Sequence, residues 1–388
     1  MMALWKTTFA RGPKMAAAAL CLTALAGCSI FSNDDGRNDP APLTEYAPGL
    51  AVKQVWKTSV GRGAGIGFAP VVINDAVYAA TPNGKLGKYN LADGRSVWTA
   101  DADTDLSAGV GTDGNVTVVA SERGEIIAYD DSGKEKWRTR ATSNVSVPPV
   151  VGFGVVVIRS GDYRIQAFDI NSGERMWSLQ RPGPALALQS GSQMVLAQGL
   201  VITGLPGGKL LAINTASGNV QWEATVSQPK GGSDLERLTD VVGAPQIAGR
   251  LLCAVAYQGR ITCFDVSQGG RALWAKDFSS SSGMTVDDRN AYTADAQSVA
   301  NAFSLDAGSN LWKQNALRNR QLSAPAVLRG AVAYGDYDGY VHFLSSTDGK
   351  LLARVSLGGG AIVSPLQTTS QGVLVQTGNG DIALIGTP

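Results

Sequence analysis

Seven of the eight tryptophans recur along the chain at intervals close to forty residues. They stand at positions 56, 98, 137, 177, 222, 274 and 312, so the intervals are 42, 39, 40, 45, 52 and 38 residues. Self-similarity at a period of this length is typical of propellers and solenoids, in which each repeat is one unit packed against its neighbours. The tryptophan spacing therefore restricts the chain to a repeat architecture.

Each repeat predicts four β-strands. Residues 70–100, PVVINDAVYAATPNGKLGKYNLADGRSVWTA, contain short apolar runs separated by the turn signals ND, PNG and ADG. Apolar runs bounded by Gly, Asn and Asp are typical of strands joined by tight turns. Four strands make one propeller blade, and the tryptophan falls on the outer strand, where its ring can pack between blades. We therefore expect these rings to be structural.

The two ends of the chain each contain part of a repeat. Residues 52–58 form a tryptophan strand that lacks the strands before it, and residues 379–388 contain a third strand that lacks the tryptophan strand after it. Joining them completes a blade, closes the ring and removes exposed sheet edges. We predict an all-β fold, an eight-bladed β-propeller over residues 51–388, with Ala353 in place of the seventh repeat's tryptophan.

The N-terminal region resembles the leader of a bacterial lipoprotein. Three basic residues precede residues 15–27, an apolar stretch too short to span a membrane. LAGC at positions 25–28 resembles a lipobox, so we expect residues 1–27 to be a signal peptide and Cys28 to be lipidated. Ser29 follows, which by lipoprotein sorting rules implies the outer membrane. An ordinary secretory signal is the alternative. Residues 28–50 are polar, and we expect a flexible tether.

The remaining composition argues against several classes of function. A formal net charge of +1 offers no electrostatic footprint for nucleic acid, and His342 is the one histidine of the chain. Cys253 and Cys263 flank a predicted hairpin centred near Gln258, which would place them opposite each other. They are either a disulfide or two buried thiols. Neither state implies catalysis.

The residues before Trp177 and Trp222 follow the pattern A-x-D/N-x-x-S/T-G-x-x-x-W, and several other repeats approximate it. This pattern resembles the tryptophan-docking repeat of quinoprotein (PQQ) dehydrogenases, which makes a PQQ-like enzyme or ligand binder the alternative function. Those enzymes bind the quinone above adjacent, disulfide-linked cysteines and hold a calcium ion, and this chain has no adjacent cysteines. No phosphate-binding loop or Cys-x-x-Cys motif occurs. We therefore expect no enzymatic activity, no cofactor and no metal.

The lipobox, the tether and the eight repeats together resemble the BamB family, the propeller lipoproteins of the outer-membrane β-barrel assembly machinery. Two segments make the resemblance specific to this family. They lie in the intervals between the tryptophans at 177 and 222 and between those at 222 and 274, which are the two longest intervals of the series after position 177. Residues 236–245, ERLTDVVGAP, resemble the family segment D/E-R-L-x-D-V-D-x-x-P, with Val242 where the family has Asp. Residues 181–191, RPGPALALQSG, resemble P-S-L-S-L-R-G, with Gln189 where the family has Arg.

The resemblance implies a docking surface. In that family the two loops bind a POTRA domain of BamA, the barrel-inserting subunit, and through it the rest of the machinery. Enlarged loops on a rigid scaffold are common places for binding surfaces. The residues carried over to this chain are Leu186, Leu188, Gln189, Arg237, Asp240 and Val242. Leu186 and Leu188 would be apolar anchors, and Asp240 would be a polar contact that fixes register.

Further expectations follow from the same resemblance. The protein would be a non-catalytic scaffold, lipid-anchored on the periplasmic face of the outer membrane, with capture of unfolded outer-membrane proteins through blade edges as a second possibility. Gln189 and Val242 stand where the family has Arg and Asp, so in this protein an electrostatic contact with the partner would be replaced by an amide and an apolar contact. The structural alternatives are an inner strand at Leu186 and Leu188, and a solvated helical turn capped by Ser233 or Asp234. A polysaccharide binder would instead expose a strip of aromatic residues.

Overall fold

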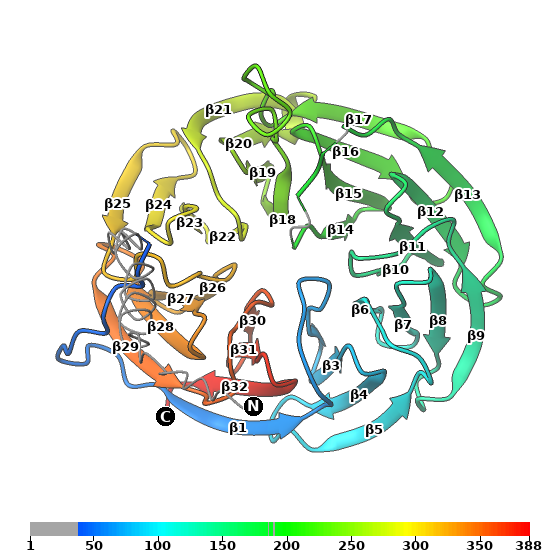
Figure 1. Cartoon of the computed structure of the whole chain (residues 1–388), viewed down its shortest axis with the longest axis horizontal. Coiled ribbons are helices and arrows are strands. Elements are labelled where there is room, and N and C mark those ends of the chain that lie inside the picture. Colours follow the sequence, from blue (N-terminus) through cyan, green and yellow to red (C-terminus); the bar gives the residue numbers. More distant parts are fainter. Residues whose placement is uncertain (1–37, 185, 189–190) are drawn as a thin grey trace, which may run out of the picture. The chain divides into compact units, whose positions relative to one another are not determined.

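Eight four-stranded antiparallel sheets stand around a common axis in the computed structural model, which describes residues 38–184, 186–188 and 191–388 (Figure 1). Residues from Pro40 to Pro388 form one unit. The predicted all-β, eight-bladed propeller is confirmed. None of the helices in the described part of the chain is long and apolar enough to cross a membrane.

The blades follow the order of the chain, and each begins with its innermost strand and ends with its outermost strand (Figure 1). One short 3-10 helix, η1 (Val266–Gln268), lies between β20 and β21. The strands are, in blade 1, β2 (Val71–Ile73), β3 (Ala76–Ala80), β4 (Lys85–Asn90) and β5 (Ser96–Asp101); in blade 2, β6 (Ala108–Thr112), β7 (Thr117–Ala120), β8 (Glu125–Tyr129) and β9 (Glu135–Arg140); in blade 3, β10 (Val150–Gly152), β11 (Val155–Arg159), β12 (Arg164–Asp169) and β13 (Arg175–Gln180); in blade 4, β14 (Met194–Ala197), β15 (Leu200–Leu205), β16 (Lys209–Asn214) and β17 (Val220–Thr225); in blade 5, β18 (Val241–Ala248), β19 (Leu251–Ala256), β20 (Gly259–Asp265) and β21 (Arg271–Phe278); in blade 6, β22 (Met284–Val286), β23 (Asn290–Ala294), β24 (Ala300–Ser304) and β25 (Asn310–Gln314); in blade 7, β26 (Ala326–Leu328), β27 (Ala331–Gly335), β28 (Tyr340–Ser345) and β29 (Leu351–Ser356); and in blade 8, β30 (Gln367–Thr369), β31 (Gly372–Gln376), β32 (Asp381–Gly386) and β1 (Lys53–Ser59).

The two ends of the chain meet in blade 8. Strand β1 pairs antiparallel with β32, and Trp56 lies opposite Leu384 in the register. The N-terminal strand is therefore the outer strand of the last blade, as the sequence predicts (Figure 1). This pairing closes the ring, so that no blade is left with an unpaired third strand.

The tryptophan rings pack between neighbouring blades. The indole nitrogen of Trp274 in blade 5 donates a hydrogen bond of 2.7 Å to the Leu305 carbonyl of blade 6. Gly308, in the turn of blade 6, has a φ of 64°, and a Cβ atom there would lie 2.4 Å from the Trp274 ring. Only glycine gives both the left-handed backbone and the space that the ring needs. The repeated glycine and tryptophan are thus two halves of one contact, and the structural interpretation of the rings is confirmed.

The antiparallel order of the strands gives the ring two distinct faces. The links between blades and the turns between the second and third strands of each blade lie on one face, which we call the link face. The other two hairpin turns of blades 1 to 7, and the turn between β30 and β31 of blade 8, lie on the opposite face, which we call the hairpin face. A position in the repeat therefore predicts the face on which a loop lies.

One local feature decides between two alternatives that the sequence left open, and a second differs from what the sequence predicted. Cys253 and Cys263 face each other across β19 and β20 and form a disulfide, with both side chains fully buried. Of the two states left open, the structure shows the disulfide. Residues 40–50, expected to belong to a flexible tether, instead contact blade 7, where the Gly49 amide donates to the Leu352 carbonyl at 2.8 Å.

Candidate functional site

The two enlarged links lie next to each other on the link face. Residues 181–193 join β13 to β14, and residues 226–240 join β17 to β18, so they flank blade 4 on either side. Residues 186–188 belong to no strand, which rules out the alternative of an inner strand at Leu186 and Leu188. The two segments singled out by their sequences are therefore brought together by the fold.

Asp240 joins the two links. One carboxylate oxygen accepts a hydrogen bond of 2.5 Å from the Leu188 amide, and the other accepts one of 3.2 Å from the Gly207 amide in the turn between β15 and β16. Only 3% of Asp240 is exposed. A buried carboxylate needs such donors, because an unpaired one would cost several kcal/mol. Asp240 thus holds the backbone of one link against the end of the other.

A half-buried positive charge, that of Arg159, acts on this carboxylate. Burial raises the pKa of Asp240 above its ordinary value, while the amide donors and the charge of Arg159 act in the opposite direction. Burial also lowers the pKa of Arg159 to about 10, so its guanidinium remains charged at neutral pH. Arg159 ends β11 and donates to the Gly204 carbonyl and, at 3.3 Å, to the Thr203 hydroxyl. Arg159 therefore connects blade 3 to blade 4 beneath the links.

The first link is also held at its start. The Tyr163 hydroxyl donates to the Pro184 carbonyl at 3.2 Å, and the Tyr163 ring lies directly against Gly183. A Cβ atom on Gly183 would lie 2.1 Å from that ring, so a larger residue there would have to displace the ring. At the far end, the Gln193 amide donates to the Gly243 carbonyl at 3.0 Å. Residues 181–193 are consequently fixed at both ends.

The second link contains a capped turn. The Glu236 amide lies 3.3 Å from the Ser233 hydroxyl, and the Glu236 carboxylate accepts from the amides of Gly232 and Ser233 at 2.8 and 3.1 Å. This reciprocal pattern is a capping box, with Ser233 as the N-cap. The solvated turn that was given as a structural alternative is therefore present, and its N-cap is Ser233 rather than Asp234. The turn leaves Leu235 67% exposed.

The predicted docking residues fall into different environments. Leu186 is 44% exposed, Arg237 is exposed, and Leu188 is half-buried. Asp240 is an internal tie rather than a surface contact, because its carboxylate is already occupied. Gln189 lies outside the described residues.

Val242 requires a correction. It is 1% exposed, pairs with Val255 in the sheet, and packs with Met284 between blades 5 and 6. A partner cannot reach it, so the hypothesis that positions 189 and 242 exchanged an electrostatic contact with a partner fails at position 242. Alternation along β18 directs Val241 and Val242 to opposite sides of the sheet, and both are buried because each side packs into a different interblade core.

Three exposed apolar residues that the sequence analysis did not single out lie on the same face: Leu235, Ile66 and, in the link from β29 to β30, Val363. Leu235 tops the capped turn, and Ile66, in the link from β1 to β2, is 40% exposed. The Ile66 carbonyl lies 3.6 Å from the Cβ position of Gly191, so the link that contains Ile66 contacts the link of residues 181–193. In the sequence, Leu235 could have been recognised as a candidate contact residue because it is an apolar residue within a polar turn.

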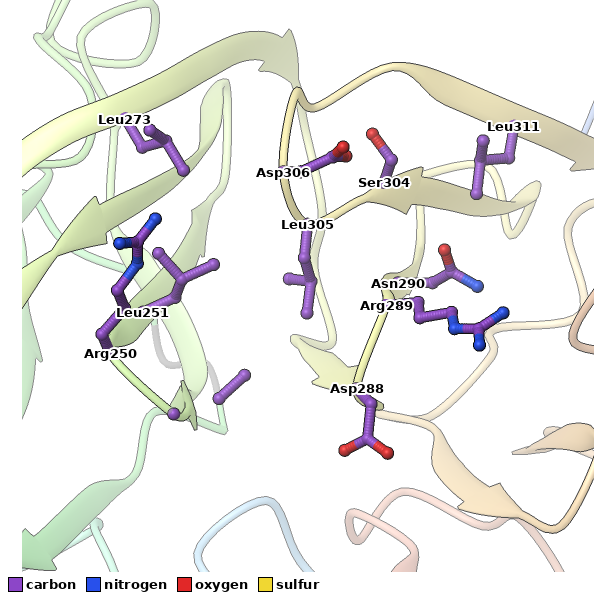
Figure 2. Close-up of a pocket in the computed structure, with 12 residues that line it drawn as sticks. Arg250, Leu251, Leu273, Asp288, Arg289, Asn290, Ser304, Leu305, Asp306 and Leu311 are labelled. Carbon is purple, nitrogen blue, oxygen red and sulfur yellow. The ribbon is translucent and has the colours of Figure 1, made fainter.

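Two cavities among the described residues were compared with the link face as ligand sites. A groove of about 700 Å³ between blades 5 and 6 is lined by Arg250, Arg289, Asp288 and Asp306, with Leu273 among its apolar walls (Figure 2). Its charged groups balance one another and point in different directions, so no single ligand charge is favoured.

A second cavity, at the axis of the ring, is where a quinone cofactor would bind in a PQQ-like enzyme. A cavity of about 520 Å³ there is lined by inner-strand residues such as Gln246, Thr285 and Gln367. The disulfide lies inside blade 5 and joins residues ten apart, unlike the adjacent cysteines of quinoproteins. Within the described ranges, no group of three or more His, Cys, Asp or Glu residues could hold a metal ion. These residues do not fit a quinone with a calcium ion.

The fold is that of a PQQ-like propeller, and its candidate site is the part of the link face formed by the two tied links. The family model described as "Outer membrane protein assembly factor BamB" matches residues 82–314. A protein of that name from Bordetella pertussis is 68% identical over 364 residues, which cover 94% of each chain. The chain belongs to the BamB family.

Solved structures give the same result for the fold. The crystal structure of BamB from Moraxella catarrhalis matches with a TM-score of 0.79 and 25% identity, covering 86% of this chain and 99% of that one. The quinohemoprotein alcohol dehydrogenase of Comamonas testosteroni matches with a TM-score of 0.68 and 14% identity, covering 90% and 79%. The second likeness shows the propeller fold alone.

Proposed function

We propose that this protein is a non-catalytic scaffold of outer-membrane protein assembly that docks onto a POTRA domain of BamA through its link face. Membership of the BamB family supports the assembly role and the outer membrane as its location. The lipobox at Cys28 supports a lipid anchor, and a lipoprotein of the outer membrane with a secretory leader faces the periplasm.

One observation carries the docking proposal. The Asp240 carboxylate fixes the Leu188 backbone and the Gly207 turn together, so the link that presents Leu186 has a set position before any partner binds. Binding then loses little conformational freedom, which is the general advantage of a preorganised surface. Apolar residues that are exposed on such a surface are the usual anchors of an interface.

Binding of the purified lipoprotein to purified POTRA domains of BamA tests the proposal. Leu186→Asp and Leu235→Asp place a charge where an apolar contact is expected, and each should weaken binding by roughly tenfold or more, on the order of 1.4 kcal/mol. Phe153→Asp is the matched control, because Phe153 is 62% exposed on the hairpin face. Equal effects of all three substitutions, or none, would contradict docking through the link face.

A further inference from the structure

The segment before β1 is bound to the side of blade 7. We call residues 40–52 the strap. At one end the Ala41 amide donates to the Arg318 carbonyl at 2.8 Å, and Arg320 donates back to the Ala41 carbonyl at 3.0 Å. At the other end the Gly49 amide bonds to Leu352, near the start of β29. Arg318 lies in a link and Leu352 follows a hairpin turn, so the strap runs from the link face to the hairpin face.

Arg354 on β29 holds the middle of the strap. Its guanidinium donates to the Thr44 carbonyl at 3.3 Å and to the Glu45 carboxylate at 3.2 Å. It also lies over the rings of Tyr46 and Tyr340, at 5.9 and 5.6 Å from their centroids. A guanidinium can make such planar and stacked contacts at once, whereas a lysine cannot.

The link-face end of the strap rests on a rigid ion network. Arg320 is 3% exposed, and its Nε lies 2.7 Å from Asp336, which is itself fully buried. A second nitrogen pairs with Asp338 at 2.7 Å, which leaves a third to bind Ala41. Because Arg320 is fixed by two carboxylates, its contact with the strap has little freedom to lose.

The strap also explains why position 353 is not tryptophan. Each tryptophan ring covers the glycine turn of the next blade, as Trp312 covers Gly349. Blade 8 has no such turn, because its third and fourth strands come from opposite ends of the chain. Ala353 is instead buried in a cluster to which Leu50 and Val52 of the strap contribute. A tryptophan at 353 would compete with the strap for this space.

We propose that the strap is a permanent part of the ring closure, so that the anchored N-terminal chain leaves the propeller on the link face, beside blades 6 and 7. The proposal rests on the proposed lipidation of Cys28, and it places the membrane anchor and the docking links on the same face. The chain from Cys28 to Pro40 can then reach at most about 40 Å. A released strap would double this reach to about 80 Å and move the exit to the hairpin face, where β1 begins.

Spin-label distances in the full-length lipoprotein test the docked strap. Labels at Ala47 and Asp348 should give one narrow distance peak, and Arg354→Ala and Ala353→Trp should each broaden it. Lys313→Ala is the matched control, because Lys313 follows Trp312 in β25 as Arg354 follows Ala353 in β29. A broad distribution in the unsubstituted protein would overturn the proposal. If Ala353→Trp does not fold, the surface substitution Arg354→Ala still decides the result.

Energy transfer to labelled lipid tests the exit face. The lipoprotein is inserted in vesicles of phosphatidylethanolamine and phosphatidylglycerol, with a donor at Arg318 on the link face or at Arg329 on the hairpin face, both exposed. We expect greater transfer from Arg318. Equal or greater transfer from Arg329, or a chain that does not float with the vesicles, would overturn the proposal. Neither experiment contains BamA, so both outcomes are independent of the docking function.

Discussion

A single carboxylate, that of Asp240, holds the two enlarged links of the link face together. Asp240→Asn replaces one acceptor oxygen with a donor that faces the amide of Leu188 or Gly207. We expect the free energy of unfolding to fall by about 1–3 kcal/mol, together with weaker binding to POTRA domains. Urea denaturation and calorimetry measure the two effects. Asp234→Asn, in the same link but exposed, should change neither, and equal effects of both would argue against an internal tie.

The one histidine of the chain, His342, should make the free energy of unfolding depend on pH. His342 is 1% exposed, and burial lowers its pKa below the ordinary value, although the nearby Asp336 carboxylate at 2.8 Å acts against this. The unfolded chain therefore binds a proton more readily than the folded one. Stability is present above about pH 6.5 and is lost as the pH falls toward the lowered folded-state pKa.

His342→Gln should remove this dependence. Between pH 7.5 and pH 5, the unsubstituted protein should lose up to about 1.4 kcal/mol of unfolding free energy per pH unit more than the variant. Urea denaturation at a series of pH values measures the slopes. Parallel slopes would show that His342 keeps its proton affinity on folding.

At the scale of the blade, the tryptophans differ in their hydrogen bonds. Trp274 and Trp98 are similarly buried, at 8% and 9% exposure. Of these two, Trp274 donates a hydrogen bond to a carbonyl of the next blade, whereas the Trp98 indole nitrogen is buried without a partner among the described residues. Trp274→Phe leaves the Leu305 carbonyl unpaired, so it should cost about 1–3 kcal/mol more than Trp98→Phe. Chemical denaturation measures both, and a larger cost at Trp98 would contradict this account.

The elements could be predicted because their sequence signals are local. The four strands of a blade, the turn glycines and the tryptophans recur within about forty residues, and the facing cysteines follow from one hairpin turn. The burial of Val242 could not be predicted in this way. Val241 and Val242 point to opposite sides of β18, and both are buried because a neighbouring blade covers each side of the sheet.

At the scale of the whole molecule, the contacts that make the site join distant parts of the chain. Asp240 reaches Leu188, 52 residues earlier, and Arg354 reaches Thr44, 310 residues earlier. Neither pairing leaves a pattern in the sequence, because a carboxylate and a backbone amide have no fixed spacing. The closure of the ring was predictable from the incomplete repeats at the two ends, whereas the strap across blade 7 was not.

The central claim is that the link face is the docking face. Site-specific photo-crosslinking in living cells tests it most directly, with the probe at Leu186, at Leu235, or at Phe153 on the opposite face as a control; all three are exposed apolar positions. We predict adducts with BamA from Leu186 and Leu235 and none from Phe153. An adduct with BamA from Phe153, with none from the two leucines, would contradict the account.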